Sequence, residues 1–292
     1  MQIAFSKTLP FFSSVFTKEI TLLGIRNGSV VFSGIQQLLY IIVYCVSFFL
    51  PALLILKYTE KYEKPITFKI SFPKHTILLF IGILGCVSLS GGMTNIIKDF
   101  LAKLGIAFKS HSPDVPDNIW LIVLLFVSSA LAPAIFEEIL FRKAVLNALL
   151  PYGNKFALVL SALSFSLMHK NPAQFLYTFV GGLFFGHLAI KCRSVVPTIV
   201  LHFINNSLAI TYLLLEKYAP VKTYIFTVST IETVLKISGV VFLLILVNRK
   251  RHKSENNITS TKEVPLKKAL SVFSITFIIY CLYSSKDWIY FI

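Results

Sequence analysis

The strongest constraint on how this chain folds is its succession of long apolar segments that contain almost no charged residues. A helix needs about 20 mostly apolar residues to cross the hydrocarbon core of a bilayer, and about eight segments approach or exceed that length. The predicted spans are residues 34–57, 75–97, 118–150, 155–169, 173–190, 194–216, 224–247 and 269–285. A helix satisfies its own backbone hydrogen bonds inside lipid. The sequence therefore predicts an all-α, polytopic transmembrane helix bundle that forms a single integral membrane domain over residues 1–292.

The composition supports a membrane protein and excludes a soluble one. Hydrophobic residues make up 55% of the 292 residues and charged residues only 14%, whereas soluble domains average about 45–50% and about 25%. The formal net charge of +15 is concentrated partly in the loops 57–74 and 248–268, where basic residues set the orientation of neighbouring spans. We therefore predict contact with membrane lipids and no nucleic-acid partner. With about eight spans, both basic loops lie on the cytoplasmic side and both termini on the other side.

The four cysteines, Cys45, Cys86, Cys192 and Cys281, are scattered and form no Cys-x-x-Cys or Cys/His ligand spacing. The sequence thus offers no disulfide framework, no zinc ribbon and no cysteine nucleophile. Residues 1–33 contain no compact apolar run that ends in the small-residue cleavage site of a secretory signal peptide.

Two of the predicted spans have unusual lengths. Span 118–150 would reach about 50 Å at 1.5 Å per residue, so it must tilt, kink or extend beyond the membrane, and Pro133 is the expected kink point. Span 155–169 is short for a crossing. Gly182 and Gly186 have the small-xxx-small spacing that brings two membrane helices into close contact.

Ionisable side chains inside membrane spans are costly and mark functional sites, and most of those in this chain fall within one stretch. Three motifs carry them, namely Glu137-Glu138-x-x-x-Arg142, Phe165-x-x-x-His169 and His202-x-x-x-Asn206. Glu138 and Arg142 are four residues apart, so they share a helix face and are expected to form an ion pair. Glu137 points about 100° away from that face. It lacks that partner and is available as a general base.

The spacing of the motifs predicts that they meet in space. The turn Pro151-Tyr152-Gly153-Asn154 separates the helix of Glu137 from the helix of His169, and both residues lie about 20 Å from this turn by helical rise. His202 follows the next turn on the same side by roughly 14 Å, and Asn206 shares its helix face. The sequence therefore predicts a buried polar cluster of these four residues inside the membrane.

Such a cluster suits hydrolysis by an activated water. Glu137 and His169 can hold and deprotonate a water, while His202 and Asn206 can donate hydrogen bonds to the oxyanion that forms when the water attacks a carbonyl. Alternatively, two histidines and a carboxylate could bind zinc with an open coordination position. The chain contains no His-Glu-x-x-His, so we favour a site without metal or other cofactor.

The three motifs, in this order within a multi-spanning chain, resemble the CPBP family of CAAX endopeptidases and Abi-type, bacteriocin-processing membrane proteins. The resemblance implies an intramembrane, glutamate-dependent endopeptidase with a helical catalytic core, here residues 118–216. By position, the resemblance implies that Glu137 activates the water and that His169 also binds this water. It implies that His202 and Asn206 are the oxyanion donors. Glu138 and Arg142 then form the supporting pair. Two positions depart from the family pattern: Lys143 and Ser166 stand where Gly is frequent.

The resemblance implies a hydrophobic or lipidated peptide or protein as the substrate. CAAX processing removes the last three residues after a prenylated Cys, whereas members in organisms without prenylated proteins are associated with bacteriocin or peptide-pheromone processing and with bacteriocin immunity. The excess of Lys over Arg and the abundance of Ile and Phe favour an AT-rich bacterial genome. We therefore expect a multi-pass protein of a bacterial cell membrane.

Other interpretations stay open at this level. The cluster could be a hydrogen-bond network that only holds helices together, or the chain could be a non-catalytic self-immunity or ligand-binding membrane protein of the same fold. Transport has less support, because no repeated halves with broken helices are visible. A second four-apart pair, Glu232 and Lys236, is interpreted as a packing ion pair within its span.

Overall fold

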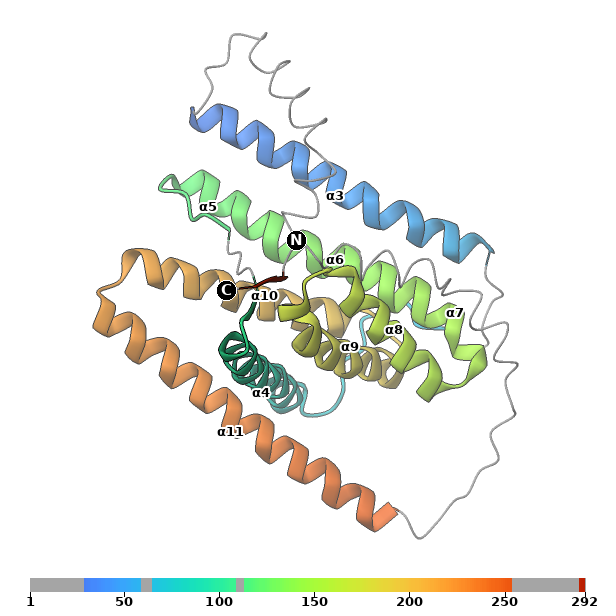
Figure 1. Cartoon of the computed structure of the whole chain (residues 1–292). Coiled ribbons are helices and arrows are strands. Elements are labelled where there is room, and N and C mark those ends of the chain that lie inside the picture. Colours follow the sequence, from blue (N-terminus) through green and yellow to red (C-terminus); the bar gives the residue numbers. More distant parts are fainter. Residues whose placement is uncertain (1–28, 59–64, 109–112, 254–288, 292) are drawn as a thin grey trace.

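The structure is a computed structural model that describes residues 29–58, 65–108, 113–253 and 289–291. Figure 1 shows long helices that lie side by side in a bundle. The helices are α3 (Val30–Tyr58), α4 (Thr76–Lys103), α5 (Ile119–Phe126), η1 (Val127–Leu131), α6 (Ala132–Glu138), η2 (Ile139–Leu146), α7 (Asn147–Leu149), η3 (Leu150–Tyr152), α8 (Asn154–Met168), α9 (Pro172–Cys192), α10 (Val196–Tyr218) and α11 (Val221–Lys253). Two short strands, β1 (Ile106–Phe108) and β2 (Ile289–Phe291), pair antiparallel beside the end of α4. The predicted helical bundle is confirmed.

Six helices in the described part of the chain are long and apolar enough to cross a membrane. They are Val30–Lys57, Thr76–Lys103, Ile119–Tyr152, Pro172–Cys192, Val196–Tyr218 and Val221–Asn248. Each of them contains most of one predicted span. The chain is therefore a polytopic integral membrane protein.

Two of the predicted spans are not among these six helices. Helix α8 has 15 residues, or about 22 Å at 1.5 Å per residue, which is less than the ~30 Å of the hydrocarbon core. The predicted full crossing at 155–169 is therefore not confirmed. The predicted span 269–285 lies outside the described residues, so the expected number of about eight spans is not confirmed.

The longest predicted span forms one continuous helical rod from α5 to η3, and two of its segments have π-helical hydrogen bonding. Segment η1 ends two residues before Pro133, and η2 begins directly after Glu138. Proline has no N–H to donate to the carbonyl four residues earlier, so an irregular turn next to Pro133 fits the expected disturbance there. π-helical turns within α-helices are frequent at functional sites, and here they flank α6 on both sides.

Helices α8 and α9 form a tightly packed hairpin. A Cβ atom on Gly182 would lie 3.0 Å from Ala162 Cα, and one on Gly186 would lie 2.7 Å from Leu158 Cδ1. The close helix contact predicted for these two glycines is confirmed. The contact fixes α8, and with it His169 directly after α8, against α9.

Helices α4 and α11 pack closely against each other, and their contacts run in opposite order along the chain, from Gly82 with Phe242 to Ser88 with Glu232. A Cβ atom on Gly239 would lie 2.5 Å from the carbonyl carbon of Gly85, which shows how closely the two backbones approach. One turn further along, Ser88 on α4 faces Glu232 on α11.

The core next to the central rod is largely aromatic. Tyr44 and Phe48, one helical turn apart on α3, have tilted rings with centres 4.6 Å apart, and Phe141 on η2 meets Phe165 on α8 edge-on at 5.3 Å. All four side chains are buried. The Phe141–Phe165 contact joins α8 to the rod, and an edge-on contact of Phe49 on α3 with Phe136 on α6, 6.2 Å between ring centres, joins α3 to it.

Candidate intramembrane active site

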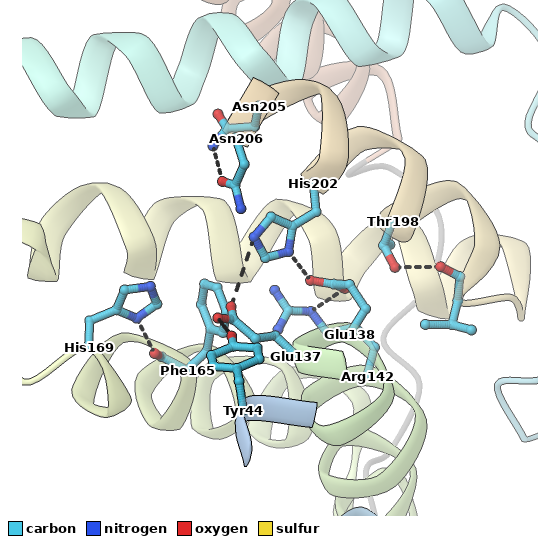
Figure 2. Close-up of polar contacts among 11 residues, drawn as sticks. Tyr44, Glu137, Glu138, Arg142, Phe165, His169, Thr198, His202, Asn205 and Asn206 are labelled. Carbon is cyan, nitrogen blue, oxygen red and sulfur yellow. Dashed lines mark hydrogen bonds and ion pairs between the residues drawn. The ribbon is translucent and has the colours of Figure 1, made fainter. Parts of the chain in front are cut away.

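The predicted site is built around α6 and the first turn of η2, in the middle of the central rod. Glu137, Glu138 and Arg142 project from this segment and are 2%, 0% and 0% exposed. Figure 2 shows them next to His202, which approaches from α10. A charge inside a protein is tolerated only where opposite charges or hydrogen bonds compensate for the lost water. The partners of each of these residues therefore define what the site can do.

Arg142 is held by one carboxylate and two aromatic rings. Its Nε lies 3.1 Å from Glu138 Oε2, which confirms the ion pair predicted from the four-residue spacing. The guanidinium carbon lies 4.5 Å from the ring centre of Phe165 and 5.8 Å from that of Phe185. Aromatic faces attract a cation more strongly when it is shielded from water. The positive charge is therefore fixed behind Glu138.

Glu138 also binds His202, and this contact fixes the orientation of the imidazole. His202 Nδ1 lies 2.9 Å from Glu138 Oε1. Because a carboxylate accepts, Nδ1 carries the hydrogen and donates it. The opposite ring nitrogen, Nε2, then faces Glu137, 3.9 Å from its Oε2 (Figure 2). The sequence placed His202 near the carboxylates but did not predict that Glu138 would orient it.

Glu137 has a partner that the sequence analysis did not identify. The hydroxyl group of Tyr44, on α3, donates a hydrogen bond to Glu137 Oε1 at 2.5 Å. Among the described residues, Glu137 Oε2 has no hydrogen-bond partner. The carboxylate is therefore anchored through one oxygen, and its other oxygen is available for chemistry.

His169 lies directly after α8, where the chain turns into α9. Its Nδ1 lies 2.8 Å from the carbonyl oxygen of Phe165. A carbonyl only accepts hydrogen bonds, so Nδ1 carries the hydrogen, and a neutral His169 has its lone pair on Nε2. The ring is thus oriented as a hydrogen-bond acceptor.

Asn206 lies on α10, four residues after His202. Asn205 Nδ2 donates to Asn206 Oδ1 at 3.3 Å, as Figure 2 shows. With its oxygen engaged, Asn206 has its amide N–H groups available as donors. Asn205 therefore orients Asn206, a role that the sequence analysis did not assign.

One cavity of about 250 Å³ brings the four predicted residues together. Glu137, His169, His202 and Asn206 all line it, and Glu138 and Arg142 lie behind this surface. The predicted buried polar cluster is therefore confirmed as an arrangement of side chains. The polar wall continues through Tyr40, Ser128, Ser129, Gln174, Thr178 and Asn205.

The part of the chain that the structure describes contains no group of three or more His, Cys, Asp or Glu residues arranged to hold a metal ion.

Ser166, one of the two departures from the family pattern, links the hairpin: it donates to Phe175 O at 2.7 Å and accepts from Thr178 Oγ1 at 3.0 Å. It lies outside the cavity lining. A hydroxyl at this position therefore stabilises α8 against α9.

One of the three comparisons with known proteins gives a match. Residues 118–208 match a family model described as type II CAAX prenyl endopeptidase, Rce1-like. The matched segment contains all three motifs and every residue of the predicted site. The comparisons with curated proteins and with solved structures gave no match.

Proposed function

We propose that the chain, whose residues 118–208 match the family model of type II CAAX prenyl endopeptidases, is an intramembrane endopeptidase that hydrolyses peptide bonds with a water activated by Glu137. One observation supports this most directly. Glu137 shares its cavity with His169, His202 and Asn206, and Tyr44 anchors one oxygen of its carboxylate.

The first step is the attack of water on the scissile carbonyl carbon. Glu137 Oε2 takes one proton from the water, and the water oxygen forms the new bond to carbon. The water keeps its other hydrogen and donates it in a hydrogen bond to His169 Nε2, because the Nδ1 hydrogen of His169 is engaged by Phe165 O. The two acceptors orient the attacking oxygen without a covalent intermediate on the enzyme.

The carbonyl oxygen of the substrate becomes negatively charged in this step and needs hydrogen-bond donors. The amide of Asn206, oriented by Asn205, supplies one. His202 supplies the second from Nε2. Since its Nδ1 hydrogen points to Glu138, donation from Nε2 requires the doubly protonated imidazolium ring.

The charges of the site then balance. Glu137 and Glu138 contribute two negative charges, and Arg142 and the imidazolium of His202 contribute two positive charges. A neutral cluster costs less inside a membrane than a charged one. We assign Glu138 and Arg142 to positioning and charge compensation, because neither lines the cavity.

The second step breaks the carbon–nitrogen bond. The oxyanion re-forms a carbonyl, and the proton that Glu137 took from the water moves to the departing amine nitrogen. The products are a peptide with a new carboxyl terminus and a peptide with a new amino terminus. Glu137 is again ionised, so the cycle is complete and requires no cofactor.

We propose a hydrophobic or lipidated peptide of the membrane as the substrate, either a prenylated CAAX-type carboxyl terminus or a bacteriocin or pheromone precursor. The site lies within the central rod, at the depth of the membrane spans. Apolar residues flank the polar wall of the cavity, namely Pro133, Phe185, Ile210 and Leu213. Such a surface suits an apolar side chain or lipid next to the scissile bond.

The test compares the purified wild type with Glu137→Gln and Glu138→Gln in detergent, with and without a strong zinc chelator. Glu216→Gln, an exposed glutamate on α10 outside the cavity, is the matched control. Cleavage of a farnesylated CAAX peptide and of a pool of hydrophobic precursor peptides is followed by mass spectrometry.

We expect Glu137→Gln to abolish cleavage while it remains folded, Glu216→Gln to behave as the wild type, and the chelator to have no effect. Loss of activity with chelator and recovery with zinc would overturn the metal-free mechanism. A folded wild type that cleaves no peptide would favour a non-catalytic immunity or binding role.

A further inference from the structure

The two ends of the helix bundle differ in the sign of their charged side chains. At one end, α3 and α9 finish and α4, α8 and α10 begin. In the terminal turns and connections of this end, each Asp, Glu, Lys or Arg whose side chain the structure describes is basic, namely Lys57, Lys69, Lys74, Lys155, Lys191 and Arg193. The opposite end carries both signs and includes Asp114, Asp117 and Glu216. We refer to the first end as the basic end.

A short segment between α3 and α4 crosses the basic end and is fixed from two directions. On one side, Asn147 on α7 binds the backbone of Ile66: its Oδ1 accepts from Ile66 N at 2.8 Å, and its Nδ2 donates to Ile66 O at 3.0 Å. On the other side, Thr67 forms a parallel bridge with Ser194, and Ser194 Oγ donates to Lys69 O. The backbone of this segment is therefore fixed between the central rod and the connection from α9 to α10.

Lys143 adds a further contact to this segment. Its Nζ donates to Ile66 O at 2.8 Å and lies 5.9 Å from the ring centre of Phe68. Glycine, which is frequent at this position in the family pattern, has no side chain to make such a contact. Lys143 directly follows Arg142 on η2, so the segment is joined to the same turn of the rod that carries the buried ion pair.

These contacts bring two exposed cations close together. The backbone N–H and the hydroxyl group of Thr67 both donate to Arg193 O, at 3.1 and 3.3 Å, and Lys69 follows two residues later. Lys69 and Arg193 thus belong to two backbone segments that lie side by side. Both side chains are exposed, and neither forms an ion pair within the described residues. A lysine and an arginine without a counter-charge are suited to bind a phosphate group.

Exposed apolar side chains lie next to these cations. Phe68, Ile70 and Phe72 are 53%, 76% and 45% exposed, although the backbone around them is held by the contacts with Asn147 and Ser194. Apolar side chains next to lysines are typical of the membrane–water interface, where the apolar groups enter the acyl boundary and the lysines reach the headgroups. The surface therefore suits a molecule that carries both a phosphate and an apolar chain.

We propose that Lys69 and Arg193 bind the phosphate of an anionic phospholipid, whose acyl region contacts Phe68, Ile70 and Phe72. A basic end without described acidic side chains attracts a lipid with net negative charge more strongly than a zwitterionic one. The bound lipid bridges the segment before α4 and the connection before α10, so it stabilises the folded protein by mass action. The proposal does not depend on the peptidase function.

The test measures lipid binding to the purified full-length protein in a neutral detergent. Dioleoyl phosphatidylglycerol and dioleoyl phosphatidylcholine, which differ in headgroup charge but not in acyl chains, are titrated and followed by native mass spectrometry and by thermal unfolding. The variants are Lys69→Gln, Arg193→Gln and the double variant. The fixed segment is held through the main-chain atoms of these two residues, so Gln removes the charge and leaves those contacts in place.

Two matched pairs of lysines serve as controls, since each removes the same charge as the double variant. Lys74→Gln with Lys155→Gln changes two exposed lysines elsewhere on the basic end, and Lys103→Gln with Lys222→Gln changes two at the opposite end. The first pair separates a defined site from a diffuse positive surface. The second pair controls for the change in total charge.

We expect Lys69→Gln and Arg193→Gln each to weaken binding of phosphatidylglycerol by about fivefold, the contribution of one basic residue at an anionic membrane surface. The double variant should bind more weakly than either and lose the rise in melting temperature that the lipid gives the wild type. Both control pairs should bind as the wild type does. Phosphatidylcholine should bind weakly to every variant.

Three results would overturn the proposal. Equal binding of the two lipids by the wild type would remove the role of charge. An equal loss of binding in the Lys74 and Lys155 pair would show a diffuse positive surface in place of a site. Binding of inorganic phosphate or glycerol phosphate as tightly as the lipid would assign the two cations to a soluble anion. Melting curves without lipid verify the fold, and the single variants decide the outcome if the double variant is unfolded.

Discussion

Removal of the Tyr44 hydroxyl tests whether Glu137 works as a positioned base. Tyr44 is 1% exposed and donates at 2.5 Å to Glu137 Oε1, so Tyr44→Phe leaves a buried carboxylate oxygen without its donor. A hydrogen bond to a charged group contributes about 1.5–3 kcal/mol, which corresponds to about 10- to 150-fold in rate at 1.36 kcal/mol per tenfold. Tyr44 does not line the cavity, and it therefore touches no substrate.

We expect Tyr44→Phe to lower kcat by about tenfold to a hundredfold, within that range, and to leave KM unchanged. Steady-state kinetics on the cleaved peptide measure both constants, and thermal unfolding in detergent verifies the fold. Tyr224→Phe on α11, outside the cavity that Glu137 lines, is the matched control. A folded Tyr44→Phe enzyme with wild-type kcat, or one in which only KM rises, would refute the anchoring of Glu137 by Tyr44.

Two further predictions concern stability. Glu138→Gln leaves Arg142 buried without its counter-charge, so this variant is expected to lose about 3–5 kcal/mol of stability. Glu137→Gln keeps the hydrogen bond from Tyr44 and should unfold close to the wild-type temperature. Equal melting temperatures for the two variants would contradict this division of roles. Gly186→Ala places a Cβ 2.7 Å from Leu158 Cδ1 and is expected to lower the free energy of unfolding by about 1–3 kcal/mol through overpacking. The control Gly34→Ala meets its nearest neighbour at 3.9 Å and should be neutral. Melting curves of the two glycine variants compare them directly.

The membrane spans could be predicted because hydrophobicity and length are properties of single segments. Helix α8 shows the limit of this reasoning. Its residues are apolar enough to suggest a crossing, but a hydropathy pattern does not distinguish lipid from protein as the surrounding medium. With 15 residues it is shorter than the ~20 that a crossing needs, and its carboxyl-terminal end places His169 beside the cavity.

Two features of the site could be predicted: contacts set by residue spacing within one helix, and the matching depth of residues on neighbouring helices. The Glu138–Arg142 pair follows from a four-residue spacing, and the common depth of Glu137 and His169 follows from a hairpin. Tyr44 was not predictable, because 93 residues separate it from Glu137 and a tyrosine in a membrane span carries no distinctive signal. The rotation of α10 that directs His202 Nδ1 to Glu138 depends on packing that spacing does not encode.

The structure gives a physical reason for two adjacent glutamates with different partners. One buried carboxylate, Glu138, holds a cation on one oxygen and an imidazole on the other, so it cannot take a proton without releasing both partners. The other, Glu137, accepts its hydrogen bond from Tyr44 through Oε1, while Oε2 has no hydrogen-bond partner among the described residues and only faces His202 Nε2 at 3.9 Å, so Oε2 can accept and return a proton while the carboxylate stays in place. If both glutamates were equally paired, no base would remain. If both were unpaired, two negative charges would share a low-dielectric site at high cost. The division between a paired and an anchored carboxylate is therefore what allows proton transfer within the membrane.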